Sequence, residues 1–213
     1  MAGNVAVLDY GSSNLRSVVK ALEYVADQKQ RIILTADPES IIAADRIIFP
    51  GQGAIRQCME NLTARGLKEV LLECIRVKPF MGICMGLQCL METSDEDGGM
   101  SALGVIPGRV SRFPEGVRDE QDHVQKIPHM GWNNVYPVLD HPLWKGIESG
   151  TRFYFVHSYY VTPDRNDDIA ATTKYAVEFT SAVARDNLFA VQFHPEKSQQ
   201  AGLTMLKNFL GWD

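Results

Sequence analysis

Several signals that would place a protein in a special class are missing from these 213 residues. The chain has no run of about 18 apolar residues, so the sequence predicts no membrane-spanning helix. Its net charge is only −5, which argues against sequence-independent binding of nucleic acid or of anionic membranes. No linker rich in Pro, Gly and Ser and no internal repeat divides the chain, so we expect a single domain over residues 1–213.

Motifs for metals, nucleotides and disulfides are missing as well. The chain contains no CxxC, HExxH, GxGxxG or GxxxxGK[ST] motif, so we expect no metal and no cofactor. Residues 1–10 have no basic n-region, and Asp9 interrupts their apolar stretch, so we expect no signal peptide. The protein is therefore expected to be cytoplasmic, with its four cysteines reduced. These are Cys58, Cys74, Cys84 and Cys89.

The first half of the chain alternates short apolar strands with amphipathic helices. Strands are expected at residues 5–9, 31–34, 46–49 and 79–83. Helices are expected at about 15–26, 67–76 and 85–91. Asn14 suits the N-cap of the first helix. Short apolar strands that are buried on both faces are typical of a parallel sheet covered by helices.

The second half is richer in strand-like segments. They lie at residues 105–113, 133–136, 153–161, 169–175, 180–185 and 189–193. Only residues 199–210 have helical spacing again, and residues 114–128 form a polar, irregular segment that we expect to be a surface loop. The whole pattern predicts a three-layer, flavodoxin-like α/β fold with a mixed, largely parallel central sheet.

A candidate nucleophile stands in the segment Gly82-Ile83-Cys84-Met85-Gly86. It follows an apolar strand and precedes a helix, as in the G-x-nucleophile-x-G elbow, with Cys in place of Ser. The glycines leave room for a tight turn, and the free N–H groups at the start of the helix favour a thiolate and can hold an oxyanion. The alternative is a buried structural cysteine, which we prefer for Cys58, Cys74 and Cys89.

A cysteine nucleophile needs a base, and His194 is the best placed of the five histidines. It ends an apolar strand and opens His194-Pro195-Glu196, where proline restricts the backbone. Glu196 could hold the imidazole in one tautomer. The alternative is a surface turn. His129 and His157 fit satisfied core or interface histidines better than catalytic ones.

A third signal is the turn Pro50-Gly51-Gln52-Gly53 after an apolar strand. In a parallel sheet this turn lies at the same edge as the elbow and could supply a second N–H to an oxyanion. A plain strand-to-helix turn is the alternative.

Together these segments resemble the three signatures of class I (triad) glutamine amidotransferases, with matching order and spacing over essentially the whole chain. Three further regions narrow the resemblance to the glutaminase subunits of imidazole glycerol phosphate synthase. They are Leu8-Asp9-Tyr10-Gly11 with Asn14-Leu15-Arg16-Ser17, then Pro128-His129-Met130-Gly131-Trp132-Asn133, and Tyr154-Phe155-Val156-His157-Ser158-Tyr159. One departure is Gln52, where the family more often has a small apolar residue.

The resemblance implies that the Cys84 thiolate attacks the side-chain amide of glutamine. His194 then protonates the departing ammonia and later activates water, while Glu196 orients His194. The backbone of Met85 and of the Gly51–Gly53 turn, which includes Gln52, would hold the oxyanion. The substrate's amino-acid end would be held by Gln88, Glu96, Ser158 and Tyr159.

The resemblance also implies a partner, a TIM-barrel cyclase subunit that forms a heterodimer with this chain and receives its ammonia. The cyclase would make imidazole glycerol phosphate and an aminoimidazole carboxamide ribotide in histidine biosynthesis. A lysine that matches Lys197 faces an acidic residue of that subunit. The interface candidates are Lys197, Tyr154, Met130, Trp132 and Asn133. Core packing is the alternative for Trp132.

Three other functions remain open at this point. One is the glutaminase subunit of an anthranilate or aminodeoxychorismate synthase, which usually has His where this chain has Leu87. A second is a stand-alone γ-glutamyl hydrolase. The third is a non-catalytic flavodoxin-like module with Asp9 at a strand end, which leaves the Cys84 elbow unexplained.

Overall fold

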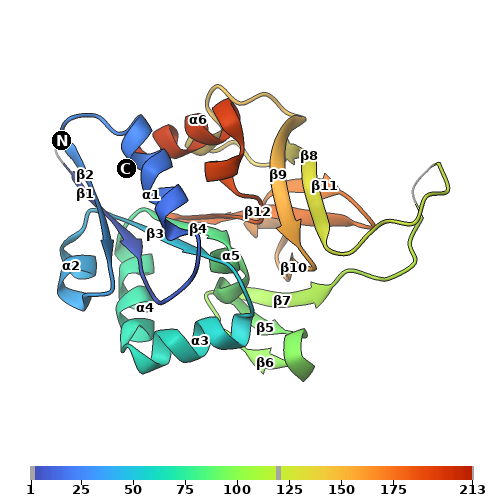
Figure 1. The fold of residues 1–213 in the computed structure, drawn as a ribbon, viewed down its shortest axis with the longest axis horizontal. Coiled ribbons are helices and arrows are strands. Elements are labelled where there is room, and N and C mark those ends of the chain that lie inside the picture. The colour runs from blue at the N-terminus through green and yellow to red at the C-terminus, as the bar shows by residue number, and fades with distance from the viewer. Residues whose placement is uncertain (1–2, 119–120, 213) are drawn as a thin grey trace.

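The computed structural model describes residues 3–118 and 121–212 and has a three-layer α/β fold (Figure 1). One half of its sheet is parallel. In spatial order this half consists of β2 (Gln30–Thr35), β1 (Gly3–Leu8), β3 (Arg46–Gly51), β4 (Phe80–Cys84) and β13 (Leu188–Val191). The carboxyl ends of these strands meet at one edge, which is where open α/β sheets bind ligands.

The other half of the sheet is mostly antiparallel. From β13 it continues through β12 (Glu178–Arg185), β10 (Tyr159–Pro163), β7 (Ile106–Arg112), β5 (Met91–Ser94) and β6 (Met100–Ser101). A branch leaves β12 through β11 (Ile169–Lys174), β8 (His129–Pro137) and β9 (Thr151–His157). The predicted α/β fold with a mixed, largely parallel central sheet is thereby confirmed, and its parallel strands run from β2 to β13.

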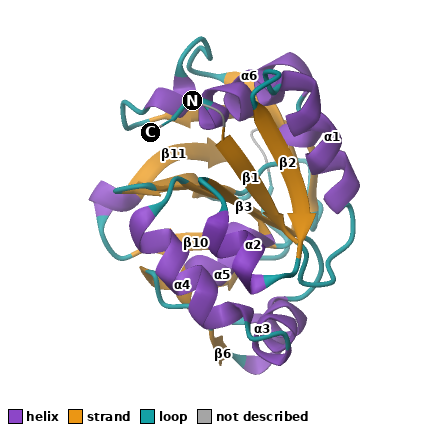
Figure 2. Ribbon diagram, turned by 90° about the vertical axis from the view of Figure 1, so that its left-hand side faces the viewer, coloured by secondary structure: helices purple, strands orange, loops and turns teal. Residues whose placement is uncertain are grey.

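Helices cover both faces of the parallel half, as Figure 2 shows. One face carries α1 (Leu15–Val25) and α6 (Gln199–Leu210). The other carries α2 (Pro38–Ala43), α3 (Ile55–Ala64), α4 (Leu67–Val77) and α5 (Met85–Leu90). Short 3₁₀ turns lie at η1 (Glu96–Gly98), η2 (Pro142–Trp144), η3 (Asn166–Asp168) and η4 (Pro195–Lys197). None of the described helices has the length and apolar character needed to cross a membrane.

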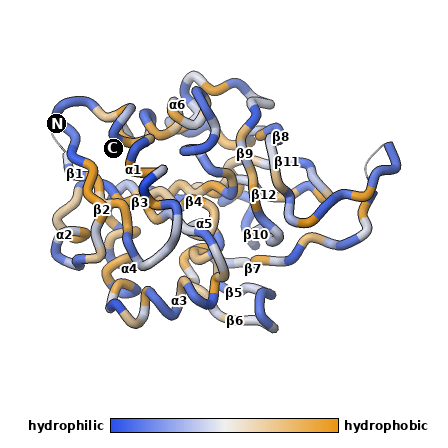
Figure 3. The backbone as a smooth tube through the Cα atoms, in the orientation of Figure 1, coloured by the Kyte–Doolittle hydropathy of each residue, from blue (hydrophilic) through white to orange (hydrophobic). Residues whose placement is uncertain are grey.

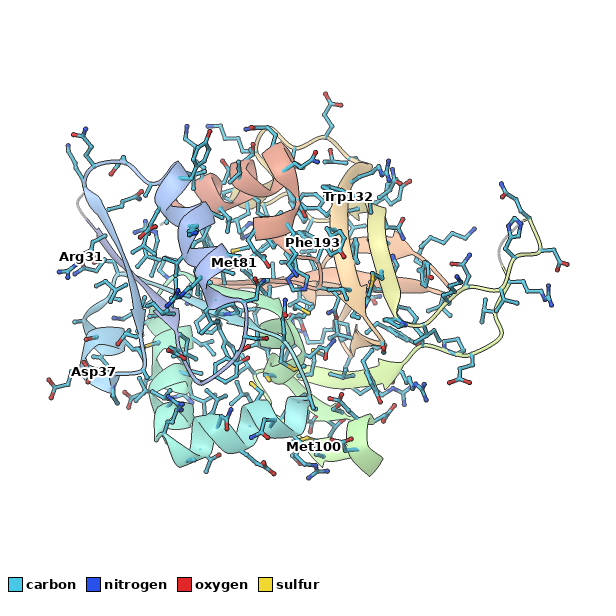
Figure 4. All side chains as sticks on the ribbon, viewed as in Figure 1. Arg31, Asp37, Met81, Met100, Trp132 and Phe193 are labelled. Atoms are coloured by element: carbon cyan, nitrogen blue, oxygen red, sulfur yellow. The ribbon has the colours of Figure 1, made fainter. Side chains whose placement is uncertain are left out.

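The strand side chains explain why helices are needed on both faces. In β1, Val5 and Val7 pack into the core under α1 and α6, while Ala6 and Leu8 pack into the core under the other helices. The tube in Figure 3 is accordingly hydrophobic along β1, β3 and β4. Burying one Val, Leu or Phe side chain stabilises the fold by about 1.5–3 kcal/mol. The side chains on both faces of the sheet contribute this free energy only because helices cover both faces. Figure 4 labels Met81 and Phe193, which belong to the core under α1 and α6.

Some elements differ from the prediction. The predicted strand at 153–161 is two strands, β9 and β10. The strand is interrupted at Ser158, and its two halves pair with different neighbours. Helix α2 was not predicted, although Asp37 accepts a hydrogen bond from the Ser40 N–H in the usual capping manner. Strands β5 and β6 were also missed. Residues 119 and 120 of the predicted surface loop lie outside the described residues.

Asn14 lies at the N-cap position of α1, as predicted, but its side chain does not cap the helix. Its backbone is left-handed, with φ 64°, and its amide nitrogen points to Glu196 instead, at 3.2 Å. Its carbonyl oxygen accepts a hydrogen bond from the Ser17 hydroxyl at 2.6 Å. The capping prediction was therefore wrong about the side chain, because a distant carboxylate binds it.

Candidate active site

The three signature segments meet at the carboxyl edge of the parallel strands. In the β3–β4 ladder Gly51 is paired with Cys84, so the Pro50–Gly53 turn lies directly beside the elbow. On the other side of β4, Val191 is paired with Ile83, and the chain reaches His194 three residues later. Three segments that are far apart in the sequence therefore lie within one small region of the fold (Figure 1).

Cys84 occupies a strained turn between β4 and α5. Its φ of 54° and ψ of −104° are values that residues other than glycine rarely adopt. The neighbouring glycines make the turn possible, because a Cβ on Gly86 would lie 1.8 Å from the Phe49 carbonyl oxygen. A Cβ on Gly82 would lie 2.9 Å from that of Ala190. Such strain persists only where the surrounding packing holds it, and it is concentrated at functional sites.

His194 and Glu196 form a buried pair beside this turn. Nδ1 of His194 lies 2.9 Å from Oε1 of Glu196, and the two side chains are 2% and 1% exposed. The same carboxylate oxygen accepts a hydrogen bond from Asn14. Within the described residues, no group hydrogen-bonds to Nε2 of His194 or to Oε2 of Glu196. Since Glu196 holds Nδ1, Nε2 is the nitrogen of His194 that is left to exchange a proton during a reaction.

Electrostatics favour a charged imidazole. Burial opposes the charged form, but the negative charge of Cys84 and the carboxylate of Glu196 outweigh it and raise the pKa of His194 to about 10. A Cys–His ion pair is the state in which a cysteine attacks a carbonyl carbon.

Two buried glutamines lie in a row beside Cys84, because Gln192 contacts the sulfur and Gln88 contacts Gln192; only Gln88 was predicted. Nε2 of Gln192 lies 3.6 Å from Sγ of Cys84. Nε2 of Gln88 donates to Oε1 of Gln192 at 3.1 Å and to the Tyr159 carbonyl at 3.2 Å. The sequence signal for Gln192 was a single polar residue at the end of an otherwise apolar strand segment.

A cavity of about 330 Å³ opens at Cys84. Its walls include seven of the eight residues predicted to bind substrate. These are Gln52, Gly53, Met85, Gln88, Glu96, Ser158 and Tyr159. Gly51, the eighth, lies on the adjoining side with His194 and Glu196. In the part of the chain that the structure describes, no three His, Cys, Asp or Glu side chains are placed to hold a metal ion.

Glu96 and Gln52, like Gln88 and the Tyr159 carbonyl, already have partners in this structure. Oε2 of Glu96 accepts a hydrogen bond from the Ile55 N–H at 2.8 Å. The other carboxylate oxygen of Glu96 does not bind the N-terminus of α3, and the residue is only half-buried, so this oxygen is left to bind a substrate. The Gln52 N–H donates to the Ser12 hydroxyl at 3.0 Å, so it would have to give up that bond before it could bind an oxyanion.

The other cysteines are buried and free, as expected of structural thiols. Cys58 on α3 and Cys89 on α5 lie within 3.1 Å of each other, sulfur to sulfur. Burial raises the pKa of the Cys89 and Cys74 thiols, so both are poor nucleophiles.

The five predicted interface residues gather on β8, β9 and η4. Met130, Trp132 and Asn133 line a surface groove of about 610 Å³. Trp132, labelled in Figure 4, lies 6.2 Å from the ring of Tyr154, and Nζ of Lys197 lies 5.8 Å above that ring. Met130 is 63% exposed and Trp132 is 37% exposed, so neither belongs to the core.

This face is tied directly to the His194 backbone. The His194 N–H donates to the Tyr154 carbonyl at 2.9 Å. The Tyr154 N–H donates to the Ser198 hydroxyl at 3.0 Å, and that hydroxyl donates to the His194 carbonyl at 2.7 Å. Ser198 was not predicted as a site residue, and its 1% exposure shows how closely it is enclosed.

The sequence profile of class I glutamine amidotransferases matches residues 6–211. The chain belongs to this family. A relative named imidazole glycerol phosphate synthase subunit HisH, from Thiobacillus denitrificans, is 54% identical over 214 residues, which cover 100% of this chain and 93% of that protein. A relative of the same name from Nitrosomonas europaea is 55% identical over 210 residues, or 98% of each chain.

Solved structures share the fold at much lower identity. A crystal structure described as a glutamine amidotransferase superposes with a TM-score of 0.71 at 16% identity, over 97% of each chain. A glutamine amidotransferase from Thermotoga maritima superposes with a TM-score of 0.65 at 14% identity, over 94% of this chain and 79% of the other.

Proposed function

We propose that this chain is the glutaminase subunit of an imidazole glycerol phosphate synthase, and that residues 1–213 act as one catalytic domain. It hydrolyses glutamine to glutamate and ammonia and passes the ammonia to a cyclase subunit in histidine biosynthesis. The observation that carries this proposal is the strained Cys84, which lies beside the buried His194–Glu196 pair and lines a cavity. Full-length relatives at 54% and 55% identity bear the name of this subunit.

The chemistry follows from the order of the groups around the cavity. The Cys84 sulfur attacks the side-chain amide carbon of glutamine, and the C–N bond breaks as Nε2 of His194 gives its proton to the leaving ammonia. A γ-glutamyl thioester remains on Cys84. His194 then takes a proton from water, whose oxygen attacks the thioester and releases glutamate and the free thiolate. Glu196 accepts the Nδ1–H of His194 throughout and keeps Nε2 directed at the reaction.

The walls of the cavity have complementary roles. The Met85 N–H and an N–H of the Gly51–Gly53 turn stabilise the oxyanion of the tetrahedral intermediate. The free carboxylate oxygen of Glu96 binds the ammonium group of glutamine. Gln88 and the backbone of Ser158–Tyr159 bind the rest of its amino-acid end.

The cyclase subunit binds the face that carries Trp132, Tyr154 and Lys197. Ammonia that escapes to bulk water is protonated and loses its nucleophilicity, so a closed passage between two docked chains preserves it. Tyr154 lies on this face, and its carbonyl accepts a hydrogen bond from the His194 N–H, so the docking face is linked directly to the backbone of the catalytic base.

The partner assay separates this function from the alternatives. Glutamine hydrolysis is measured for the chain alone, with the cyclase subunit plus its nucleotide ligand, and with an anthranilate synthase partner. We expect the cyclase subunit with its ligand to stimulate glutamine hydrolysis and the anthranilate synthase partner to have no effect. Full activity without a partner supports a stand-alone γ-glutamyl hydrolase, and stimulation by the anthranilate synthase partner supports the other amidotransferase class.

A further inference from the structure

Buried polar side chains join the active-site cavity to the surface groove. His157 and Tyr159 line the cavity, whereas His129 and Asn133 line the groove. The two histidines are paired directly across the antiparallel strands β8 and β9. A continuous line of hydrogen bonds therefore runs from the groove to the cavity.

The inner end of this line fixes the protons on both rings. Nδ1 of His157 lies 2.8 Å from the Tyr159 carbonyl oxygen, which can only accept, so this nitrogen carries a proton. Nε2 of a neutral His157 is then an acceptor, and it lies 2.9 Å from Nδ1 of His129, which must donate. Nε2 of His129 is left as an acceptor.

The outer end agrees with this assignment. The amide nitrogen of Asn133 lies 3.2 Å from Nε2 of His129 and donates to it. This amide cannot be reversed without loss, because its oxygen accepts from the Asn134 N–H at 2.8 Å and its nitrogen also donates to the Lys174 carbonyl at 2.9 Å. All contacts are satisfied only when both rings are neutral Nδ1–H tautomers.

Packing holds the rings in place and keeps them neutral. His129 stacks on Tyr175, with ring centroids 3.9 Å apart, and on Phe155 at 4.8 Å. Burial lowers the pKa of His129 to about 4 and that of His157 to about 3. The two rings thus form a rigid, uncharged strut between β8 and the β9–β10 break.

The strut ends on the Tyr159 carbonyl, which is connected through two glutamine side chains to the Cys84 sulfur. The Tyr159 carbonyl accepts from His157 and from Nε2 of Gln88. Gln88 in turn holds Gln192, whose amide lies against Sγ of Cys84. A shift of the Tyr159 carbonyl would therefore move the wall that holds the amino-acid end of the substrate.

We propose that His129 and His157 are positioning residues that place the Tyr159 carbonyl and Gln88 for glutamine binding, with Asn133 as the point where a docked partner acts on them. This inference rests on the proposed glutaminase function. It assigns neither histidine to the chemical step, which belongs to Cys84, His194 and Glu196.

The tautomers can be tested independently of any activity. Nitrogen-15 NMR of the histidine-labelled protein distinguishes a protonated from an unprotonated ring nitrogen. We expect both His129 and His157 to be protonated at Nδ1 and unprotonated at Nε2 at pH 7. Finding the Nε2–H tautomer or a charged ring at either residue would overturn the proposal.

The kinetic test uses two substitutions of the same residue. His129→Phe preserves stacking but removes the donor to His157, whereas His129→Asn keeps an amide donor near the Nδ1 position. With the cyclase subunit present, we expect His129→Phe to raise the KM for glutamine about tenfold and to leave kcat within about twofold of the wild-type value. The KM of His129→Asn should lie close to that of the wild type.

His141→Phe is the matched control, because His141 also packs against aromatic rings and accepts one hydrogen bond, from the Leu143 N–H. It lies outside the strut, so its KM should stay at the wild-type value. An unchanged KM in His129→Phe, or equal changes in all three variants, would refute positioning. An inactive wild-type complex would refute the glutaminase function instead and would leave the NMR result standing.

Discussion

The imidazole of His194 lies 2.9 Å from the carboxylate of Glu196, and Asn14 from a distant part of the chain holds the same carboxylate oxygen. Only Pro195 separates the two paired residues in the sequence, so the 3₁₀ turn of η4 brings them together locally. The contact from Asn14 is long-range and fixes the carboxylate against α1. The orientation of the base thus depends on both the local turn and the packing of the first helix.

Replacing this carboxylate tests its orienting role. Glu196→Gln keeps an oxygen that can accept from Nδ1 of His194 and from Asn14, so we expect a smaller loss of kcat than in His194→Ala or Cys84→Ala. By analogy with other triads, the difference should be about one to two orders of magnitude. Steady-state glutamine hydrolysis by the complex measures it, and equal losses in all three variants would count against an orienting role.

Lys197 tests the coupling between the docking face and the site. Its ammonium lies over the Tyr154 ring, next to the turn that carries Glu196. We expect Lys197→Ala to weaken cyclase binding modestly and to reduce the stimulation of glutaminase activity by the cyclase's ligand. A solvated lysine would leave both unchanged, since an exposed ion pair contributes only about 0–1 kcal/mol. Titration with the cyclase subunit, with and without its ligand, distinguishes these results.

Ser198 is expected to matter for stability. Its buried hydroxyl joins the His194 carbonyl to the Tyr154 N–H, and Ser198→Ala leaves both without this partner. We expect a loss of about 2 kcal/mol in the free energy of unfolding, measured with urea. Thr204→Val is the matched control, because the Thr204 hydroxyl also donates to a carbonyl four residues earlier, but in a hydrogen bond that is accessible to solvent. A similar small effect in both variants would show that the Ser198 hydroxyl does not stabilise the link between His194 and Tyr154.

Acid should destabilise the protein through its buried neutral histidines. In the folded state the pKa of His129 is about 4 and that of His157 about 3, below the ordinary value of about 6.5. The unfolded chain therefore binds more protons below pH 6.5, and stability falls as the pH is lowered through this range. Each group contributes a slope of up to about 1.4 kcal/mol per pH unit.

His194 has the opposite effect. Its folded pKa is raised to about 10, so its contribution is complete below about pH 6.5 and is lost as the pH rises toward 10. Urea unfolding from pH 4.5 to 9.5 should give a maximum near pH 6–7. His129→Phe should remove about one proton from the acid slope, and an unchanged slope would show that His129 is not buried as a neutral ring.

Much of the site could be predicted because its signatures are local. The Cys84 elbow and the His194–Glu196 turn are each contained in a few residues, and strand order in a parallel sheet brings such turns to one edge. The only local signal for Gln192 was its polarity in an apolar segment, and that signal does not identify Cys84 and Gln88 as its partners.

The missed features depend on contacts between distant segments. Asn14 is a residue type that commonly caps helices, yet its side-chain amide donates to Glu196, which lies 182 residues away in the sequence. The strand break at Ser158 could not be predicted, because Phe153–Val161 is rich in aromatic and β-branched residues and only the different partners of β9 and β10 divide it. Tertiary pairing overrode local propensity at both positions.

The most direct measurement uses the Cys84→Ala variant in complex with the cyclase subunit, supplied with either glutamine or ammonium salts. If Cys84 produces ammonia for a separate acceptor site, glutamine-dependent synthesis of imidazole glycerol phosphate is abolished while ammonium-dependent synthesis stays near the wild-type rate. Size-exclusion chromatography verifies that the complex remains assembled. An equal loss of both activities in an intact complex, or undiminished use of glutamine, would contradict this division of labour.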